Sequence, residues 1–221
     1  MTLTQKHATT VFVVDDDRPM RDSLVALISA MGYAARGFES GQRFRESYQP
    51  SMPGCLVLDI QMPLQTGLEL YEELVRDGQR LPVIFMTAHA DVATAVAAMK
   101  TGAIEFLEKP FDRQTLLDRI ERAVALDADW RRREADFNKF DARIARLTER
   151  ERDTLELILS GAPNKAMAAR LQISQRAVEM RRAAIMRKLQ VVSLAELLEL
   201  AVTHRIMAEI TGALSNSWLR G

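Results

Sequence analysis

The first 127 residues alternate short apolar runs with helical patterns, and this alternation is the feature that most restricts the possible fold. Most of the runs are rich in Val, Ile, Leu and Phe and are bounded by turn residues or charges. Such runs are typical of buried parallel strands. Strands that alternate with helices predict a doubly wound α/β fold with a five-stranded parallel sheet. The expected strands are Thr9–Val14, Tyr33–Phe38, Gly54–Asp59, Leu81–Met86 and Ala103–Leu107.

Capping residues and helical spacing predict where the intervening helices lie. Asp17 stands where it could cap the helix after the first strand, and Ser40 and Asp112 open later helices. The sequence also predicts a helix from Gly67 to about Asp77 and an Ala-rich helix over Asp91–Lys100. A helix is therefore expected after each of the five strands.

Polar side chains follow the strands at the ends where parallel strands meet. Right-handed crossovers bring the carboxyl ends of parallel strands to one edge of the sheet. The residues expected at this edge are Asp15, Asp16, Asp59, Thr87 and Lys109. Grouped carboxylates repel one another and need a cation, and oxygen ligands without His or Cys favour Mg²⁺. An Asp nucleophile beside a divalent metal, a lysine and a hydroxyl predicts phosphoryl transfer onto Asp59, which forms an acyl phosphate.

The charge of the chain is divided unevenly, although the formal net charge is zero. Residues 1–127 contain 13 Lys and Arg against 18 Asp and Glu, whereas residues 128–221 contain 17 against 12. The positive excess in the second part suggests contact with nucleic acid. The single cysteine, Cys55, cannot form an intrachain disulfide. Because there is no signal-peptide pattern and no apolar run of the ~18 residues that a span needs, we expect a cytoplasmic protein without membrane contact.

The second part of the chain has start signals for four helices. Thr148 and Glu151 form a capping box before the first of them. The caps of the other three are expected at Asn164, Ser174 and Ser193. A short helix, a tight turn and a longer basic helix, followed by a fourth helix that ends near His204, predict an all-α helix-turn-helix domain.

The third of these helices is the predicted DNA-contacting element. Val178, Ile185 and Leu189 share one helical face and should pack inward, which leaves polar side chains on the other faces. Residues 165–188 contain seven basic residues and one acid. Arginine can read guanine in a major groove, whereas other basic residues grip phosphate. The expected DNA contacts are Lys165, Arg176, Glu179, Arg181, Arg182, Arg187 and Lys188.

Residues 9–127 resemble the receiver domain of bacterial two-component response regulators, which has a flavodoxin-like fold. The resemblance is carried by VVDDD, by LDIQMP with Gly67, by MTAH and by LEKP. It implies that Asp59 is the phospho-acceptor, that a sensor histidine kinase is the donor and that Mg²⁺ is the cofactor. The implied ligands of Mg²⁺ are Asp16, Asp59, the backbone carbonyl of Gln61 and, through water, Asp15. The implied phosphoryl contacts are Thr87 and Lys109, with Phe106 as the switch aromatic and Lys109–Pro110 as a bond that is often cis in the family.

Residues 147–208 resemble the LuxR-type helix-turn-helix of the FixJ/NarL class of response regulators. The matching motifs are LTERER, SGAPNKAMA, ISQRAVEMRRAAIMRKL and SLAELLELA. Gln172 departs from the turn glycine that is common in the family, so we expect a turn backbone that does not need glycine, and Arg181 stands where many members have histidine. The resemblance implies promoter DNA as a partner, a homodimer on phosphorylation and RNA polymerase as a candidate partner. The last helix is the usual dimer contact of the family, and its candidate residues for that contact or for the core are Leu194, Leu197, Leu198 and Val202.

The two resemblances predict the organisation of the whole chain. We expect a receiver domain in residues 1–127, a helical linker in 128–146, a DNA-binding domain in 147–208 and a tail in 209–221. The linker helix is expected to extend as far as Ala145. Its apolar spacing fits either a short two-chain coiled coil or a solvated helix that carries the cluster Arg131–Arg133.

Two other functional classes are compatible with parts of the sequence. An aspartyl-phosphate phosphatase also uses Asp, Mg²⁺ and Lys. Such enzymes generally have a second Asp shortly after the nucleophile, where this chain has Gln61. A phosphorylation-gated protein that binds another protein or RNA would not need the helix-turn-helix. We therefore expect a phosphorylated transcription regulator that is not an enzyme.

Overall fold

The computed structural model describes residues 9–88 and 105–211. The chain divides into two compact units, residues 1–130 and 131–221. Among the described helices, none combines the length and the apolar character that crossing a membrane requires. The predicted helix over Asp91–Lys100 lies outside the described residues.

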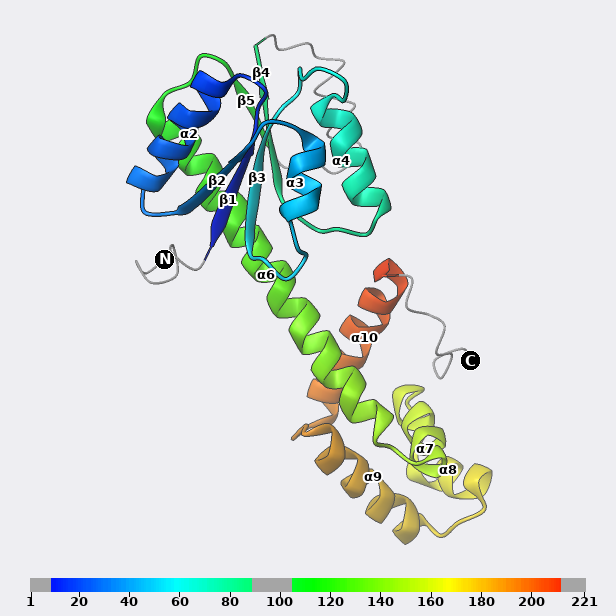
Figure 1. The fold of residues 1–221 in the computed structure, drawn as a ribbon. Helices are drawn as coiled ribbons and strands as arrows, with labels where there is room; N and C mark the ends of the chain where they lie inside the picture. Colours follow the sequence, from blue (N-terminus) through cyan, green and yellow to red (C-terminus); the bar gives the residue numbers. More distant parts are fainter. Residues whose placement is uncertain (1–8, 89–104, 212–221) are drawn as a thin grey trace. The chain divides into compact units, whose positions relative to one another are not determined.

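The first unit is built on a five-stranded sheet with the strand order β2-β1-β3-β4-β5 (Figure 1). The strands are β1 (Thr10–Val14), β2 (Ala34–Phe38), β3 (Gly54–Asp59), β4 (Val83–Thr87) and β5 (Glu105–Glu108). All neighbouring pairs are parallel. The predicted doubly wound fold is confirmed. The order reverses between β1 and β3, and such switch points are where α/β sheets hold their ligands.

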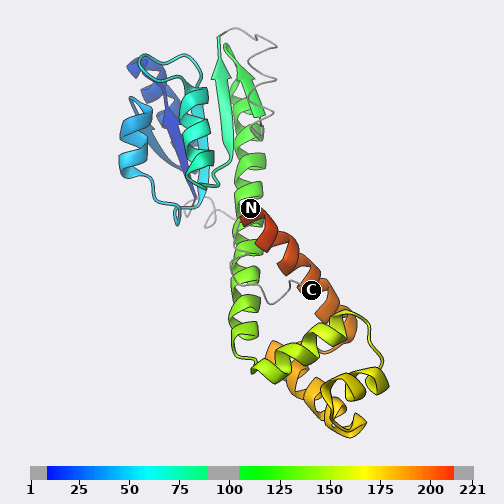
Figure 2. The same ribbon diagram turned by 90° about the vertical axis from the view of Figure 1, so that its right-hand side faces the viewer.

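Helices cover both faces of this sheet (Figure 2). They are α2 (Arg18–Ala30), α3 (Gly41–Ser47), α4 (Gly67–Arg76) and the first part of α6 (Arg113–Ala145). Successive residues of β1 point to opposite faces, so Phe12 packs with side chains of α3 and α4, whereas Val13 packs with side chains of α2 and α6. The strands read as continuous apolar runs because both faces of the sheet are buried.

The helix starts in the first unit follow the predicted caps with one exception. The Ser40 hydroxyl accepts a hydrogen bond from the backbone N–H of Arg43, and the Asp112 carboxylate accepts one from the backbone N–H of Thr115. Asp17 is the N-cap residue of α2, as predicted, but its side chain makes no capping hydrogen bond. Pro19 occupies the second helical position and has no N–H, which removes one of the donors that a cap would satisfy.

The second unit is all-helical and is built around α9. Its elements are the last part of α6, α7 (Glu149–Leu159), α8 (Asn164–Leu171), α9 (Gln175–Leu189) and α10 (Leu194–Thr211). Val178, Ile185 and Leu189 are fully buried, which confirms the inward face predicted for α9. Phe140 and Ile144 of α6 pack in the same core. The end of the predicted linker is therefore part of the core of the second unit rather than a solvated helix.

The helix boundaries of the second unit differ from the prediction at two places. The Thr148–Glu151 capping box and the caps at Ser174 and Ser193 are present. Pro163, not Asn164, is the N-cap of α8, and the Asn164 side chain accepts a hydrogen bond from Arg182 at 3.0 Å instead. Helix α10 continues to Thr211 rather than ending near His204, because no Gly or Pro interrupts it before residue 212.

Candidate functional site

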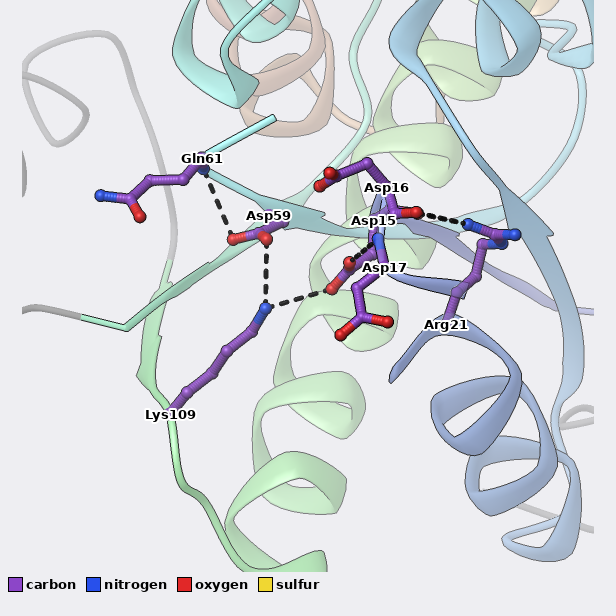
Figure 3. A network of polar contacts seen from close by, with 7 residues as sticks. All are labelled: Asp15, Asp16, Asp17, Arg21, Asp59, Gln61 and Lys109. Atoms are coloured by element: carbon purple, nitrogen blue, oxygen red, sulfur yellow. Dashed lines mark hydrogen bonds and ion pairs between the residues drawn. The ribbon is translucent and has the colours of Figure 1, made fainter. Parts of the chain in front are cut away.

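Three carboxylates meet at the carboxyl edge of the sheet (Figure 3). Asp15 and Asp16 follow β1, and Asp59 ends β3, which is paired with β1. One carboxylate oxygen of each residue lies within 4.8 Å of the others. Asp15 is fully buried and Asp59 is 8% exposed, whereas Asp16 is exposed. The fold thus brings together the three acids that the sequence placed at strand ends.

Lys109 supplies positive charge to two of these acids. Its Nζ lies 3.1 Å from Asp15 Oδ2 and 3.1 Å from Asp59 Oδ2. Figure 3 shows the ammonium between these two carboxylates. Burial lowers the pKa of Lys109, but the hydrogen bonds and charges of Asp15 and Asp59 outweigh burial, so the pKa of the ammonium rises above its ordinary 10.5. The backbone N–H of Lys109 donates to the carbonyl of Thr87 at 2.8 Å, and the Lys109–Pro110 bond is cis. Lys109 is therefore a charged ammonium held between the two buried carboxylates.

The Asp15 carboxylate is held from two sides. Its Oδ1 accepts a hydrogen bond from the backbone N–H of Asp17 at 2.9 Å, and its Oδ2 accepts the one from Lys109. Burial raises the pKa of Asp15 above its ordinary 3.8, while Lys109 opposes that rise. Asp59 is supported less strongly from its own loop, since the backbone N–H of Gln61 lies 3.5 Å from Asp59 Oδ1.

The charge and the donor atoms of this cluster fit a divalent cation. Lys109 offsets only one of the three carboxylate charges, which leaves a formal charge of −2. The three donors are all carboxylate oxygens, which suit Mg²⁺ and other hard cations. Asp15, Asp16 and Asp59 are therefore the residues that could hold such an ion.

The two remaining predicted residues of the first unit lie on neighbouring strands. Thr87 ends β4 and is 7% exposed. Phe106 lies on β5, where the strand register pairs it with Phe85 and pairs Thr87 with Glu108. The Phe106 ring stacks on Phe85 with the centroids 5.6 Å apart. Thr87 thus lies at the edge of the sheet where the acids lie. Phe106 lies two residues before that edge along β5, since it is paired with Phe85 rather than with Thr87.

Part of the predicted DNA-contacting surface is exposed in the second unit. Arg176, Glu179 and Arg187 of α9 are exposed, and so is Lys165 of α8. Residues 176, 179, 183 and 187 follow helical spacing and form one outward face of α9. An exposed basic face on the longer helix of a helix-turn-helix can enter a major groove.

Three other residues predicted to contact DNA bind polar groups of neighbouring helices in the second unit. Arg181 donates hydrogen bonds to the carbonyl of Arg150 and to the hydroxyl of Thr154 at 3.3 and 3.2 Å. Lys188, which is exposed, forms an ion pair with Glu151 at 2.7 Å. Arg182 is half-buried against the Asn164 side chain. These cations join α9 to α7 and α8.

Two residues that bear on these sites did not emerge from the sequence. Arg21 on α2 donates a hydrogen bond of 2.7 Å to the backbone carbonyl of Asp15, and no local sequence signal separates it from Arg18 of the same helix. Met180 on α9 is 68% exposed, beside Glu179. Its helical phase could have shown this, because Met180 lies two residues from the buried Val178 and therefore points away from the core.

Comparison with known proteins yields matches to both units. Residues 11–121 match the family described as response regulator receiver domain, and residues 145–201 match bacterial regulatory proteins of the luxR family. The transcriptional regulatory protein FixJ of Azorhizobium caulinodans is 41% identical over 192 residues, which cover 87% of this chain and 91% of FixJ. The low-resolution structure of the response regulator StyR is 42% identical, has a TM-score of 0.77 and covers 88% of this chain and 98% of StyR. Full-length FixJ from B. japonicum is 37% identical with a TM-score of 0.55, over 90% of this chain and 98% of that structure.

Proposed function

The chain belongs to the FixJ-like two-component response regulators, which join a receiver domain to a LuxR-type DNA-binding domain, and we propose that it accepts a phosphoryl group on Asp59 and then binds promoter DNA as a dimer. The donor is a phosphohistidine of a sensor histidine kinase, and the reaction takes place in the cytoplasm. The contact of Lys109 with both Asp15 and Asp59 carries this proposal. A partly buried ammonium between two carboxylates can also bind the oxygens of a phosphoryl group.

The chemistry at Asp59 is a transfer of one phosphoryl group. A carboxylate oxygen of Asp59 attacks the phosphorus atom, the P–N bond breaks, and its electron pair stays on the imidazole nitrogen of the donor. Bound Mg²⁺ supplies positive charge that offsets the phosphoryl oxygens. Asp16, Asp59 and the backbone carbonyl of Gln61 would hold the ion directly, and Asp15 would hold it through water.

Lys109 and Thr87 are the groups that receive the transferred phosphoryl oxygens. Lys109 exchanges its ion pair with Asp59 for one with the acyl phosphate, because that carboxylate loses its charge on phosphorylation. The Thr87 hydroxyl turns toward the same oxygens, and Phe106 moves into the space that Thr87 leaves. This coupled movement changes the surface around β4 and β5 and provides the signal for dimerisation.

A homodimer is supported by the apolar surface of α10. Leu194, Leu198, Val202 and Ile206 recur at intervals of four residues and are each more than a third exposed. Leu197 is fully buried and belongs to the core instead. We assign the exposed stripe to contact with α10 of a second copy and the exposed face of α9 to promoter DNA. RNA polymerase is a further candidate partner at the promoter.

An enzymatic role is the competing hypothesis. Phosphatases that pass through an aspartyl phosphate place a second acid shortly after the nucleophile, and Gln61 cannot act as a general acid or base. The relatives are transcriptional regulators, which supports a phospho-acceptor that is not an enzyme. Release of phosphate is then the slow hydrolysis of the acyl phosphate itself.

The acceptor assignment is tested with acetyl phosphate, which needs no knowledge of the kinase. Wild-type protein with Mg²⁺ should gain one phosphoryl group, measured by intact mass, and hydroxylamine should remove it, as expected of an acyl phosphate. Asp59→Asn should gain none, whereas Asp22→Asn removes an exposed acid of α2 and should leave the reaction unchanged. Phosphorylation of Asp59→Asn at the wild-type rate would show that another residue is the acceptor.

A further inference from the structure

The loop that carries Asp15 and Asp16 is held by a side chain from the helix that follows it. Arg21 folds back from the second turn of α2, and its Nη1 donates to the backbone carbonyl oxygen of Asp15 at 2.7 Å (Figure 3). The same nitrogen lies 3.4 Å from the carbonyl oxygen of Asp16. One guanidinium thus contacts the backbone of both acids without touching either carboxylate.

The local structure explains why such support is needed. The backbone of this loop leaves the sheet after the hydrogen bond from Asp15 N–H to the carbonyl of Phe38. The Asp17 side chain does not cap α2, so the usual link between a loop and its helix is missing. A charge-assisted hydrogen bond from Arg21 replaces it.

The neighbouring strand makes room for this arrangement. A Cβ atom on Gly37 of β2 would lie 3.0 Å from Arg21 Cγ and 3.1 Å from Val25 Cγ2. Glycine at this position therefore lets the aliphatic part of Arg21 lie close against the sheet while its guanidinium reaches the loop. The side chain is half-buried and has little freedom to leave the loop.

We propose that Arg21 is a positioning residue for the divalent cation site, which fixes the backbone from which Asp15 and Asp16 project. This inference rests on the metal site of the proposed function and adds a residue to it. Two effects of the guanidinium oppose each other. As a nearby positive charge it weakens cation binding, whereas as a loop anchor it strengthens binding by keeping the carboxylates in place. Because its donor contacts two carbonyl oxygens of the ligand-bearing residues, we infer that anchoring is the larger effect.

The sign of the change in metal affinity separates these effects. The full chain is titrated with Mn²⁺, a paramagnetic substitute for Mg²⁺, and free Mn²⁺ is measured by electron paramagnetic resonance with displacement by Mg²⁺. Arg21→Gln should weaken Mn²⁺ binding by about tenfold, the lower end of what loss of outer-shell support costs. Arg18→Gln is the matched control, because Arg18 lies on the same helix, is exposed and pairs with Asp22. It removes the same charge and should leave the affinity within about twofold of wild type.

The possible outcomes are distinct. Equal or tighter Mn²⁺ binding by Arg21→Gln would overturn the positioning role, as would equal weakening in Arg18→Gln. The Mn²⁺ affinity also distinguishes a purely structural role of Arg21. In that case Arg21→Gln would lower the free energy of unfolding without changing the Mn²⁺ affinity of the folded protein. Asp16→Asn locates the ion: if wild-type protein binds no Mn²⁺, or Asp16→Asn binds it as tightly, the proposed metal site itself is wrong.

Discussion

Arg143 Nη1 donates a hydrogen bond of 3.1 Å to the backbone carbonyl oxygen of Leu189, so α6 contacts the last residue of α9 within the second unit. The final carbonyls of a helix have no intrahelical partner, and a cation there also meets the negative end of the helix dipole. The helix that begins in the first unit therefore contributes directly to the stability of α9.

Removing this contact should loosen the end of α9. We expect Arg143→Met to cost about 1.4 kcal/mol, which corresponds to roughly tenfold faster hydrogen exchange for amides near Leu189. Arg146→Met is the control, because Arg146 is exposed and only one turn away. Hydrogen exchange of the full chain, followed by mass spectrometry, makes the comparison. Equal exchange in the two variants would mean that the Arg143 hydrogen bond contributes no net stability.

The arginines of α9 are of two kinds: some are exposed on its outward face, and others form hydrogen bonds within the second unit. Arg176→Ala should weaken DNA binding by about 1–3 kcal/mol, because Arg176 is exposed on the outward face. Arg181→Ala should instead lower the free energy of unfolding by about 1 kcal/mol, because it removes two hydrogen bonds to α7. The measurement is binding of each beryllofluoride-treated variant to a duplex that wild-type protein selects from random DNA. If Arg181→Ala remains fully folded and loses as much affinity as Arg176→Ala, Arg181 contacts DNA after all.

Divalent cation should stabilise the first unit against unfolding. Mg²⁺ at about 100 times its Kd should add about 2.7 kcal/mol to the free energy of unfolding, provided that it binds only the folded state. The cluster gains most from the ion because three carboxylates face a single ammonium. Urea unfolding with and without Mg²⁺ measures the gain. Asp16→Asn should lose most of it, and Asp22→Asn should retain it.

The stability of the second unit should fall in mild acid. His204 is 5% exposed, stacks on Phe137 with the ring centroids 4.3 Å apart, and places Nε2 3.2 Å from Asp141 Oδ1. Burial lowers the pKa of His204 below its ordinary 6.5, and Asp141 offsets only part of that shift. The folded state therefore binds fewer protons than the unfolded state. The stability contributed by His204 is complete above about pH 6.5 and is lost as the pH falls through the lower pKa of the folded state.

Calorimetry of the full chain tests this direction. When the pH is lowered from about 7.5 to about 5.5, the unfolding temperature of the second unit should fall further in wild-type protein than in His204→Gln. His7→Gln controls for the removal of a histidine. A wild-type loss no larger than that of His204→Gln would show that other groups cause the acid sensitivity.

Much of the fold was predictable because its signals are local. The apolar runs identified all five strands within two residues of their observed limits, and right-handed crossovers then required Asp15 and Asp59 to meet at one edge. Capping boxes were equally informative, since Thr148 and Glu151 are only three residues apart. One expectation for a turn was wrong: Gln172 takes the left-handed conformation that favours glycine, at a φ of 55°.

The failures share a physical cause, which is that neighbouring groups changed the hydrogen bonds available to a side chain. Asp17 makes no capping hydrogen bond where a proline in the first turn of α2 lacks an N–H. The Asn164 side chain accepts a hydrogen bond from Arg182 and does not cap a helix. Helical phase predicted which side chains of α9 face the core. It did not show that Arg181, which is partly buried, and Lys188, which is exposed, bind polar groups of α7.

The sequence by itself determined the strands, their polar ends and the inward face of α9, because periodicity and turn chemistry act over a few residues. Only the tertiary structure decided which distant groups become partners. Lys109 reaches Asp15 across 94 positions of sequence, and the buried Asp127 accepts a hydrogen bond from the N–H of Gly54 across 73. A buried polar group needs a hydrogen-bond partner, but the neighbouring sequence does not say which residue that partner is. The packing of helices and strands decides which distant residue comes within reach.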